Sequence, residues 1–360
     1  MNLRLLIFMP LLLVPFAETS SRPINACAPA PQRGVTVDIA SESAIIIWDE
    51  KTNTQHFIRR ATFSTSATGE TKVTDFGFLV PTPSKPKVTE AEDKAFDALS
   101  EITSPAIEMR ARPSDTGCGI GCASAVKRDE AATSVGEKVE VLEQGQVGNF
   151  NYEILKSNDP LALTDWLNDN KYEIRPALTR WMDPYVRKGW IITAFKIAKD
   201  SKSTGAAAKA VRMSFEAKEP IFPYREPDDM GEAKGKRMLR VYFIGEGKAS
   251  ALAGTANWVA RIAWADRPSE SQWKTLLPHL NLPGLELNNW WLTEFEDPSS
   301  PRAGNVDVAF NTKGSDQTPT KRPPKIIYTS SNSGAMPTYL GFAAIVACLY
   351  CVRALRFIVR

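Results

Sequence analysis

The feature that most constrains this chain is an uncharged apolar stretch near its C-terminus. No charged residue occurs between Lys325 and Arg353, and residues 337–359 form a largely apolar run of 23 residues. At 1.5 Å per residue, a helix of this length crosses the hydrocarbon core of a bilayer. Three arginines among the last eight residues favour a membrane span over a buried core helix. They also predict that this end faces the cytoplasm.

The N-terminus has the three-part pattern of a secretory signal peptide. Arg4 precedes an apolar run, Leu5–Phe16, and a polar stretch closes on Ala26. The run is shorter than the ~20 residues that a span needs, and its two prolines disfavour the alternative of a buried N-terminal helix. We therefore predict a signal peptide over residues 1–26. Cleavage after Ala17 is the other option, although Pro15 would then occupy a position that prefers a small residue.

Together the two ends predict a single-pass protein of the cell membrane. Its ectodomain would lie on the extracytoplasmic side, in the periplasm or outside the cell, with a short cytoplasmic tail. The whole chain carries a formal charge of +3. Loss of the signal segment removes one positive charge and the tail arginines carry three more, so the ectodomain is close to −1. This charge excludes nucleic acid as a partner. The membrane is the expected partner, and an envelope protein or a glycan is a further candidate.

The chain has five cysteines, one near the N-terminus and two close pairs. Cys348 and Cys351 fall inside the predicted span, where they act as small apolar residues. Cys118 and Cys122, in the sequence CGIGC, are candidates for a local disulfide outside the cytoplasm. Cys27 follows the predicted cleavage site. Its sequence, INAC, loosely resembles a lipoprotein cleavage box, so lipidation of Cys27 remains an open alternative.

A zinc site is the alternative role for the CGIGC cysteines. Cys118 and Cys122 with the chain's two histidines, His56 and His279, would supply two sulfur and two nitrogen ligands. The spacing matches no standard zinc site, and nothing marks either cysteine as an activated nucleophile. We therefore predict no metal, no cofactor and no catalytic residue.

Hydrophobic periodicity predicts an α+β fold with antiparallel or mixed sheets and a few short helices. Thr89 and Glu92 suggest a capping box for the first helix, and Asp159 suggests an N-cap for the second. Helices are expected over 89–103, 158–170, 175–190 and 269–280. Strands are expected over 35–39, 43–48, 55–63, 74–81, 139–142, 148–155, 190–198, 211–222, 238–247, 257–266, 290–295 and 305–310.

The same pattern suggests how the chain is divided. We expect an ectodomain over 27–310, with candidate sub-lobes at 27–104 and 137–310. A mobile insertion over 105–136 would join them. Residues 311–336 are rich in proline, serine and threonine, which is typical of a tether between a domain and a membrane.

Three short motifs invite a functional interpretation. Asp75-Phe76-Gly77 resembles a kinase signature, but the other kinase motifs are missing from the sequence, so we interpret residues 74–86 as a strand-to-helix corner. Glu294 and Glu296 share a strand face, as a catalytic carboxylate pair would, although solvated strand residues are the commoner case. Adjacent strand residues point to opposite faces, so one of Trp290 and Trp291 should be exposed or meet another surface. We therefore regard the pair as a candidate binding patch.

Taken in order, several segments resemble a bacterial envelope family, domain of unknown function 2330. They are IIIWDE, DFGFLVPTPSKP, FDAL, and the long segment from VGNFNYEILK through LTDWLNDNKYEIRPALTRWMDPYVRKGW to IITAFKI. The resemblance covers roughly Cys27 to Phe310, and EPIFPYRE and WLTEFED fit it more loosely. The opening CAPAPQRG departs from the family's cysteine- and glycine-rich start. The resemblance implies export and frequently a C-terminal anchor, and it supplies no activity and no catalytic residues.

From the sequence we expect a membrane-tethered, non-enzymatic ectodomain that binds or scaffolds something at the cell envelope. An exported hydrolase or redox enzyme with an unrecognised site is the alternative. A third reading is a purely structural envelope protein.

Overall fold

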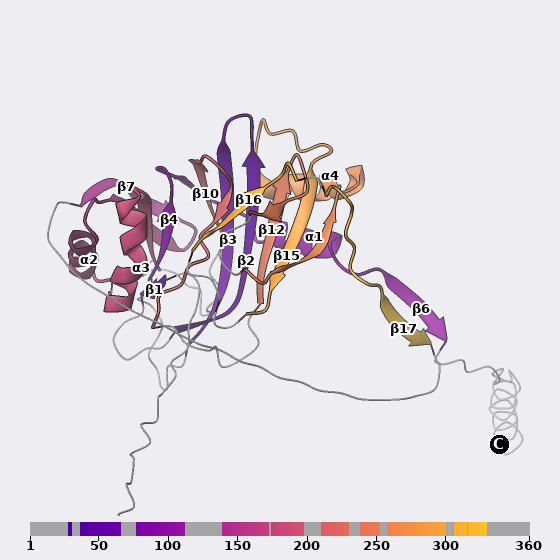
Figure 1. Ribbon diagram of the computed structural model, residues 1–360, viewed down its shortest axis with the longest axis horizontal. Coiled ribbons are helices and arrows are strands. Elements are labelled where there is room, and N and C mark those ends of the chain that lie inside the picture. The colour runs from indigo at the N-terminus through magenta and orange to yellow at the C-terminus, as the bar shows by residue number, and fades with distance from the viewer. Residues whose placement is uncertain are drawn as a thin grey trace, which may run out of the picture. The chain divides into compact units, whose positions relative to one another are not determined.

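The structure, a computed structural model, describes residues 28–30, 37–65, 77–111, 139–172, 174–197, 210–229, 238–252, 258–299, 302, 306–314 and 316–329. The chain divides into two compact units. Unit 1 contains residues up to Ser104 and Glu130–Arg322, and unit 2 contains Pro105–Asp129 and the chain from Pro323 onward. The expected α+β class with mixed sheets is confirmed (Figure 1).

The largest sheet of unit 1 has seven strands in the order β14-β15-β12-β2-β3-β10-β5. The β12–β2 pair is parallel and the other pairs are antiparallel. At its centre, Ala44 and Ile46 face one core while Ile45 and Ile47 face another. A strand buried on both faces is expected to read as a continuous apolar run. The strands are β2 (Val37–Asp49), β3 (Thr54–Thr65), β5 (Lys87–Glu90), β10 (Val211–Glu216), β12 (Met238–Gly245), β14 (Arg261–Asp266) and β15 (Trp291–Asp297).

A second, fully antiparallel sheet has the order β1-β4-β9-β8-β7. Its strand β4 contains the Phe78-Leu79-Val80 part of the predicted corner. Phe78 and Val80 face one core and Leu79 faces the other, as their alternation predicts. The strands are β1 (Ala28–Ala30), β4 (Gly77–Thr82), β7 (Glu140–Val147), β8 (Phe150–Lys156) and β9 (Ile191–Ile197).

The first of the prolines that follow this run lies within strand β4. Strand β4 continues through Pro81, which pairs with Ile192 on β9. Strand β1 pairs only with residues 77–79 of β4, so Pro81 lies beyond the stretch that β1 covers. Because proline cannot donate a ladder hydrogen bond, it is tolerated where a strand has a neighbour on one side only.

The four helices that the structure describes are amphipathic, and each buries its apolar side. Asp159 caps α2 by accepting a hydrogen bond from the Leu161 amide, with Pro160 at the first helical position, as predicted. Ser269 and Gln272 form a capping box on α4. The helices are α1 (Lys94–Ile102), α2 (Pro160–Asp169), α3 (Pro176–Arg187) and α4 (Glu270–Leu280).

The capping box predicted for the first helix is wrong. Thr89 lies in β5, paired with Arg212 of β10, and its hydroxyl accepts a hydrogen bond from Arg212 Nε. Glu92 instead contacts His279 Nδ1 at 2.7 Å. Helix α1 begins five residues later than Thr89, after Asp93, which makes no side-chain cap. Because Thr89 pairs with β10, it forms part of a strand and does not begin the helix.

Unit 1 is layered, with helices outside and the two large sheets inside (Figure 1). Helices α2 and α3 pack on the outer face of the five-stranded sheet. Helices α1 and α4 pack on the outer face of the seven-stranded sheet. A third core, rich in phenylalanine, lies between the sheets. Because strands from both of the expected sub-lobes pair within each large sheet, residues 27–104 and 137–310 do not form separate lobes.

The segment expected to be a tether is, in its first half, part of unit 1. The central strand of a small sheet, β11-β16-β13, ends at Asn311, the first residue of the predicted tether. Beyond it, Lys248 Nζ contacts Asp316, and Thr320 pairs with Ala265. Proline and serine content therefore did not reveal that the chain up to Arg322 belongs to unit 1. The strands are β11 (Ile221–Phe222), β13 (Ser250–Ala251) and β16 (Val308–Asn311).

Unit 2 contains a two-stranded parallel sheet, β6 (Ile107–Ala111) and β17 (Lys325–Thr329). Its strands come from the predicted insertion and the predicted tether, so neither segment is wholly irregular. The other predictions for these regions lie outside the described residues: the signal peptide, Cys27, Cys118, Cys122 and residues 337–359. Of the helices α1 to α4, none has the length and apolar character that crossing a membrane requires.

Candidate functional site

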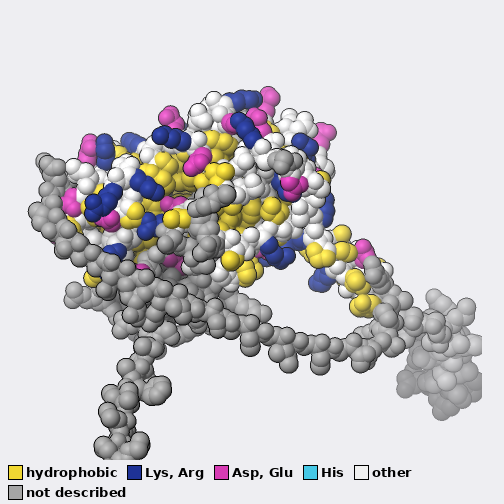
Figure 2. Space-filling view, viewed as in Figure 1, with side chains coloured by type: hydrophobic (Ala, Val, Ile, Leu, Met, Phe, Trp, Pro, Cys, Tyr) yellow, Lys and Arg dark blue, Asp and Glu magenta, His cyan; other side chains and the backbone are white. Residues whose placement is uncertain are grey.

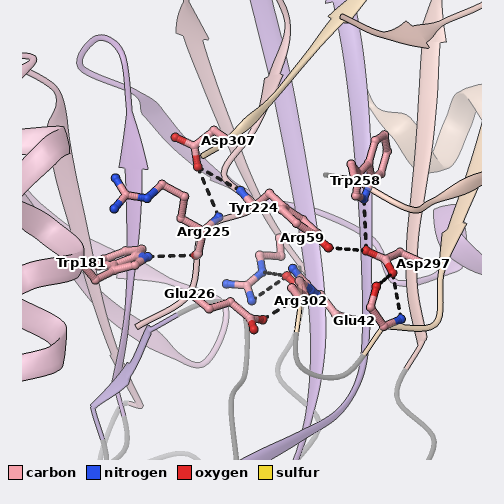
Figure 3. Close-up of polar contacts among 11 residues, drawn as sticks. Glu42, Arg59, Trp181, Tyr224, Arg225, Glu226, Trp258, Asp297, Arg302 and Asp307 are labelled. Atoms are coloured by element: carbon pink, nitrogen blue, oxygen red, sulfur yellow. Dashed lines mark hydrogen bonds and ion pairs between the residues drawn. The ribbon is translucent and has the colours of Figure 1, made fainter. Parts of the chain in front are cut away.

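A cluster of buried charge lies between the inner faces of the two large sheets (Figure 3). Glu42 on β2 accepts a hydrogen bond at 3.0 Å from Arg59 Nε on β3 and one at 2.6 Å from Arg302 Nη2. Arg302 Nε lies 3.4 Å from Glu226 Oε1. We call these four residues the Arg302 network. Its two carboxylates and two guanidinium groups balance in charge.

Arg302 is the centre of this network, and its side chain is almost completely buried. Burial acts to lower the pKa of Arg302, but Glu42 and Glu226 outweigh it and raise that pKa above the ordinary value. The guanidinium also lies 5.2 Å from the ring centroid of Tyr224, within reach of a cation–π interaction. A buried ion of this kind is tolerated only while its partners are present.

A second polar cluster joins the same region to the end of β15 (Figure 3). Asp297 Oδ2 accepts hydrogen bonds from Tyr224 Oη at 2.7 Å and Trp258 Nε1 at 3.2 Å. Asp307 Oδ1 accepts from Tyr185 Oη at 2.8 Å and from the Tyr224 amide at 3.1 Å. Burial raises the pKa of Asp307, opposed by the hydrogen bond from Tyr185. These contacts fix the segment around Tyr224 between the sheets.

A small pocket opens beside the Arg302 network. It offers space for about one water molecule, which is too little for a sugar ring or a peptide side chain. The charged groups beside it are already paired with each other. The region is therefore built as a closed structural junction. The lining residues are Glu42, Phe57, Arg59, Leu79, Val80, Pro81, Trp181 and Pro223.

The carboxylates of β15 share a face as expected, but the interpretation of Glu294 and Glu296 as solvated is wrong. Both are buried. Arg322 Nη2 contacts Glu294 at 2.6 Å and Glu296 at 2.9 Å, and Arg261 contacts Glu296 at 2.6 Å. Arg240 lies 3.5–3.7 Å from the same pair. The sequence could not reveal that three arginines converge on these carboxylates from other segments.

Burial and the arginines act in opposite directions on Glu296. Burial favours a raised pKa, but hydrogen bonding and charge from Arg322, with Arg261 and Arg240, hold the pKa of Glu296 below its ordinary value. Glu296 is therefore ionised at neutral pH. A proton donor in catalysis requires the opposite shift.

The two histidines lie on different elements and have different partners. His56 on β3 faces Ser214 across the β3–β10 pair, with 2.8 Å between His56 Nδ1 and Ser214 Oγ. Burial, followed by the nearby charge of Arg212, lowers the pKa of His56 to about 4. His279 pairs with Glu92. Within the described ranges, no group of three or more histidines, cysteines and acidic residues is arranged to hold a metal ion.

The expectation that one tryptophan of the Trp290–Trp291 pair is exposed is wrong, because both are buried. Trp290 precedes β15, in a turn where its amide bonds to the Leu287 carbonyl and where Asn289 has a φ of 67°. Strand alternation therefore does not apply to the pair. Trp290 enters the core beneath α4, and Arg267 lies over the Trp291 ring at 4.9 Å. The pair offers no exposed patch.

A family model described as an uncharacterised protein conserved in bacteria, DUF2330, matches residues 24–276. The chain belongs to this family. The match includes the β2–β3 hairpin, β4, α1, β8, α2, α3 and β9, which contain most of the segments that carry the resemblance, and it ends before the WLTEFED of β15. Membership in DUF2330 brings no activity with it, and no curated protein matches the sequence.

Solved structures give only a distant likeness. A mutated baculovirus P35 after caspase cleavage is 9% identical, with 75% of this chain and 99% of that chain covered at a TM-score of 0.34. The caspase-8/P35 complex is 8% identical, with 77% and 97% covered at the same TM-score. At this score the likeness supports no statement about function.

Proposed function

We propose that this DUF2330 protein is a membrane-tethered ectodomain of the bacterial envelope. In this proposal it binds or scaffolds an envelope protein or a glycan and performs no catalysis. The apolar run over residues 337–359 and the signal-like N-terminus support tethering and export. Family membership supports the bacterial setting.

The main support for a function without catalysis is the way in which the two carboxylates on β15 are paired with arginine. Acid–base catalysis by two carboxyl groups needs one of them to hold a proton near neutral pH. Glu296 is held in its ionised form, and Arg322 bonds to both Glu296 and Glu294. The four residues of the Arg302 network are likewise paired with one another. The acidic and basic side chains of these two clusters thus hold the fold together, which favours a rigid ectodomain that presents surfaces.

Cross-linking of the full chain in its native envelope tests this proposal. We expect one envelope component to be recovered with the wild-type chain, and the chain to resist alkaline extraction from membranes. A variant ending at residue 336 should lose the membrane association while unit 1 stays folded. Failure to recover any specific component would remove support for a binding function.

One contact favours the alternative of an exported hydrolase. Ser214 Oγ and His56 Nδ1 are within hydrogen-bonding distance, as a nucleophile and its base must be. A histidine whose pKa is about 4 is, however, a weak base at neutral pH. A redox function would instead rest on Cys118 and Cys122, which lie outside the described residues.

A fluorophosphonate probe, which labels activated serines, separates the binding and hydrolase proposals. We expect no Ser214-dependent labelling, and we expect Ser214→Ala to leave recovery of the cross-linked component unchanged. Labelling that disappears in Ser214→Ala and in His56→Gln would instead support the hydrolase.

A further inference from the structure

The β6–β17 sheet of unit 2, which we call the ribbon, has one markedly apolar face. In a parallel pair, residues that are register partners point to the same side. Ile107 pairs with Lys325 and Met109 pairs with Ile327, so these four side chains share one face. Glu108 lies on the opposite face, as the alternation of the strand requires.

The apolar side chains of this face point outward. Ile107 is 66% exposed, Met109 is 72% exposed and Ile327 is 39% exposed. Tyr328, which pairs with Arg110 on the opposite face of the ribbon, is also exposed. These four residues are among the seven large apolar residues that are exposed in the described part of the chain. Apolar side chains are prominent on the ribbon in the space-filling view (Figure 2).

A two-stranded ribbon with exposed apolar side chains needs a covering surface. Two strands alone are marginally stable in water, and parallel pairing is weaker than antiparallel pairing. Exposed apolar side chains gathered on one small element mark an interaction surface. The course of the chain then indicates which surface lies nearby.

Thr329, the last residue of β17, is followed by seven residues before the apolar run that begins at Pro337. Seven extended residues reach at most ~25 Å. A chain that enters the bilayer at Pro337 therefore keeps the ribbon close to the membrane, with enough length for the ribbon to lie along it. Lys325 on the apolar face is exposed, where its ammonium group suits anionic lipid headgroups.

We propose that Ile107, Met109 and Ile327 rest on the extracytoplasmic surface of the membrane and enter its interfacial region, with Lys325 at the headgroups. The inference rests on the membrane tethering proposed above. It adds a second contact with the bilayer, which would hold the ectodomain close to the membrane. The partner is the lipid surface itself. A second copy of the ribbon is an alternative occupant that the experiment distinguishes.

The test places a photo-reactive benzoylphenylalanine at Met109 in the full chain, reconstituted in vesicles of phosphatidylethanolamine and phosphatidylglycerol. The matched control places the same residue at Glu108, on the same strand but the opposite face. A second probe at Ile107 guards against a local effect of one substitution. After irradiation, mass spectrometry of the ribbon peptide reports adducts with lipid or protein. We expect lipid adducts at Met109 and Ile107 in several-fold excess over Glu108.

The outcomes separate the two proposals. If the chain is extracted from the vesicles by alkaline carbonate, both the tethering and the ribbon contact are wrong. If the chain resists extraction but Met109 forms no more lipid adduct than Glu108, the ribbon contact alone is overturned. Cross-linked dimers through Met109 in place of lipid adducts would likewise overturn it in favour of a second copy.

Discussion

Unit 1 and the ribbon arrange polar and apolar groups in opposite ways. In unit 1, Glu42, Glu296 and Arg302 are buried, although charged residues are almost never fully buried unless they are paired. In the ribbon, Ile107 and Met109 are exposed. These buried charges are paired with one another, and the pocket beside the Arg302 network holds about one water molecule. The exposed apolar face of the ribbon leaves apolar surface that a partner can cover. We therefore infer that the charges of unit 1 serve stability and that the ribbon serves contact.

The largest effect is expected from breaking the Arg302 network. Arg302→Met leaves Glu42 and Glu226 buried with less positive charge near them, so we expect a loss of ~3–5 kcal/mol in the free energy of unfolding. Urea unfolding of the full chain in mild detergent, followed by tryptophan fluorescence, measures it. The control is Lys274→Met, which removes an exposed pair with Glu270 and should change stability little. Similar effects of both variants would contradict a structural role for the buried charge.

A smaller loss is expected at the β15 carboxylates. Arg322→Met removes hydrogen bonds to both Glu294 and Glu296, which should cost ~1.5–3 kcal/mol. Arg240→Met is the matched control, because Arg240 faces the same carboxylates at longer distances and is more exposed. Its loss should stay within ~1 kcal/mol. An equal loss in both variants in the same unfolding assay would mean that long-range charge outweighs direct contact.

His56 should make the stability of unit 1 depend on pH. Its pKa is about 4 in the fold, against an ordinary value of 6.5, because burial and then Arg212 disfavour its charged form. As the pH falls below 6.5 the unfolded chain binds the proton first. The contribution of neutral His56 to the free energy of unfolding is therefore fully present above pH 6.5 and is lost as the pH falls towards 4. Allowing for the partial exposure of His56, the loss should reach ~2 kcal/mol.

His56→Gln should flatten this part of the pH profile, because glutamine does not titrate. Unfolding measured at a series of pH values between 4 and 7 compares the variant with the wild type. Identical slopes in the two chains would show that other groups set the pH dependence.

The smallest effect on stability is expected in the ribbon. Met109→Ser changes an exposed side chain, so the free energy of unfolding of unit 1 should stay within ~0.5 kcal/mol of the wild type. The same fluorescence-detected unfolding measures it. A loss of more than ~1 kcal/mol would show that Met109 packs in the fold, which would remove the contrast between the two regions.

Local sequence signals predicted most elements of unit 1. The apolar run Ile45–Ile47 forms the doubly buried part of β2, and Asp159 with Pro160 begins α2 where expected. These succeed because the signal and the structure lie within a few residues. Thr89 and Glu92 had an equally local signal that failed, because strand pairing with β10 supplied more hydrogen bonds than a helix cap could.

The residues of the candidate site have partners far away in the sequence, so no local sequence pattern could predict the site. Glu42 and Arg302 are 260 residues apart in sequence, and Arg322 comes from a segment that reads as a tether. A weaker signal was present, since Glu42 shares a strand face with Ala44 and Ile46, and a charge on an apolar face needs a buried partner. The sequence indicates that such a partner exists but not which residue supplies it.

The most direct test of the central claim is a double-mutant cycle between Glu42 and Arg302. Glu42→Gln, Arg302→Met and the double variant are unfolded under the same conditions in the full chain. If the buried charges stabilise unit 1 as mutual partners, the double variant should be less destabilised than the sum of the single variants, with a coupling energy of ~1.5–3 kcal/mol. Additive losses, with a coupling energy near zero, would contradict the claim.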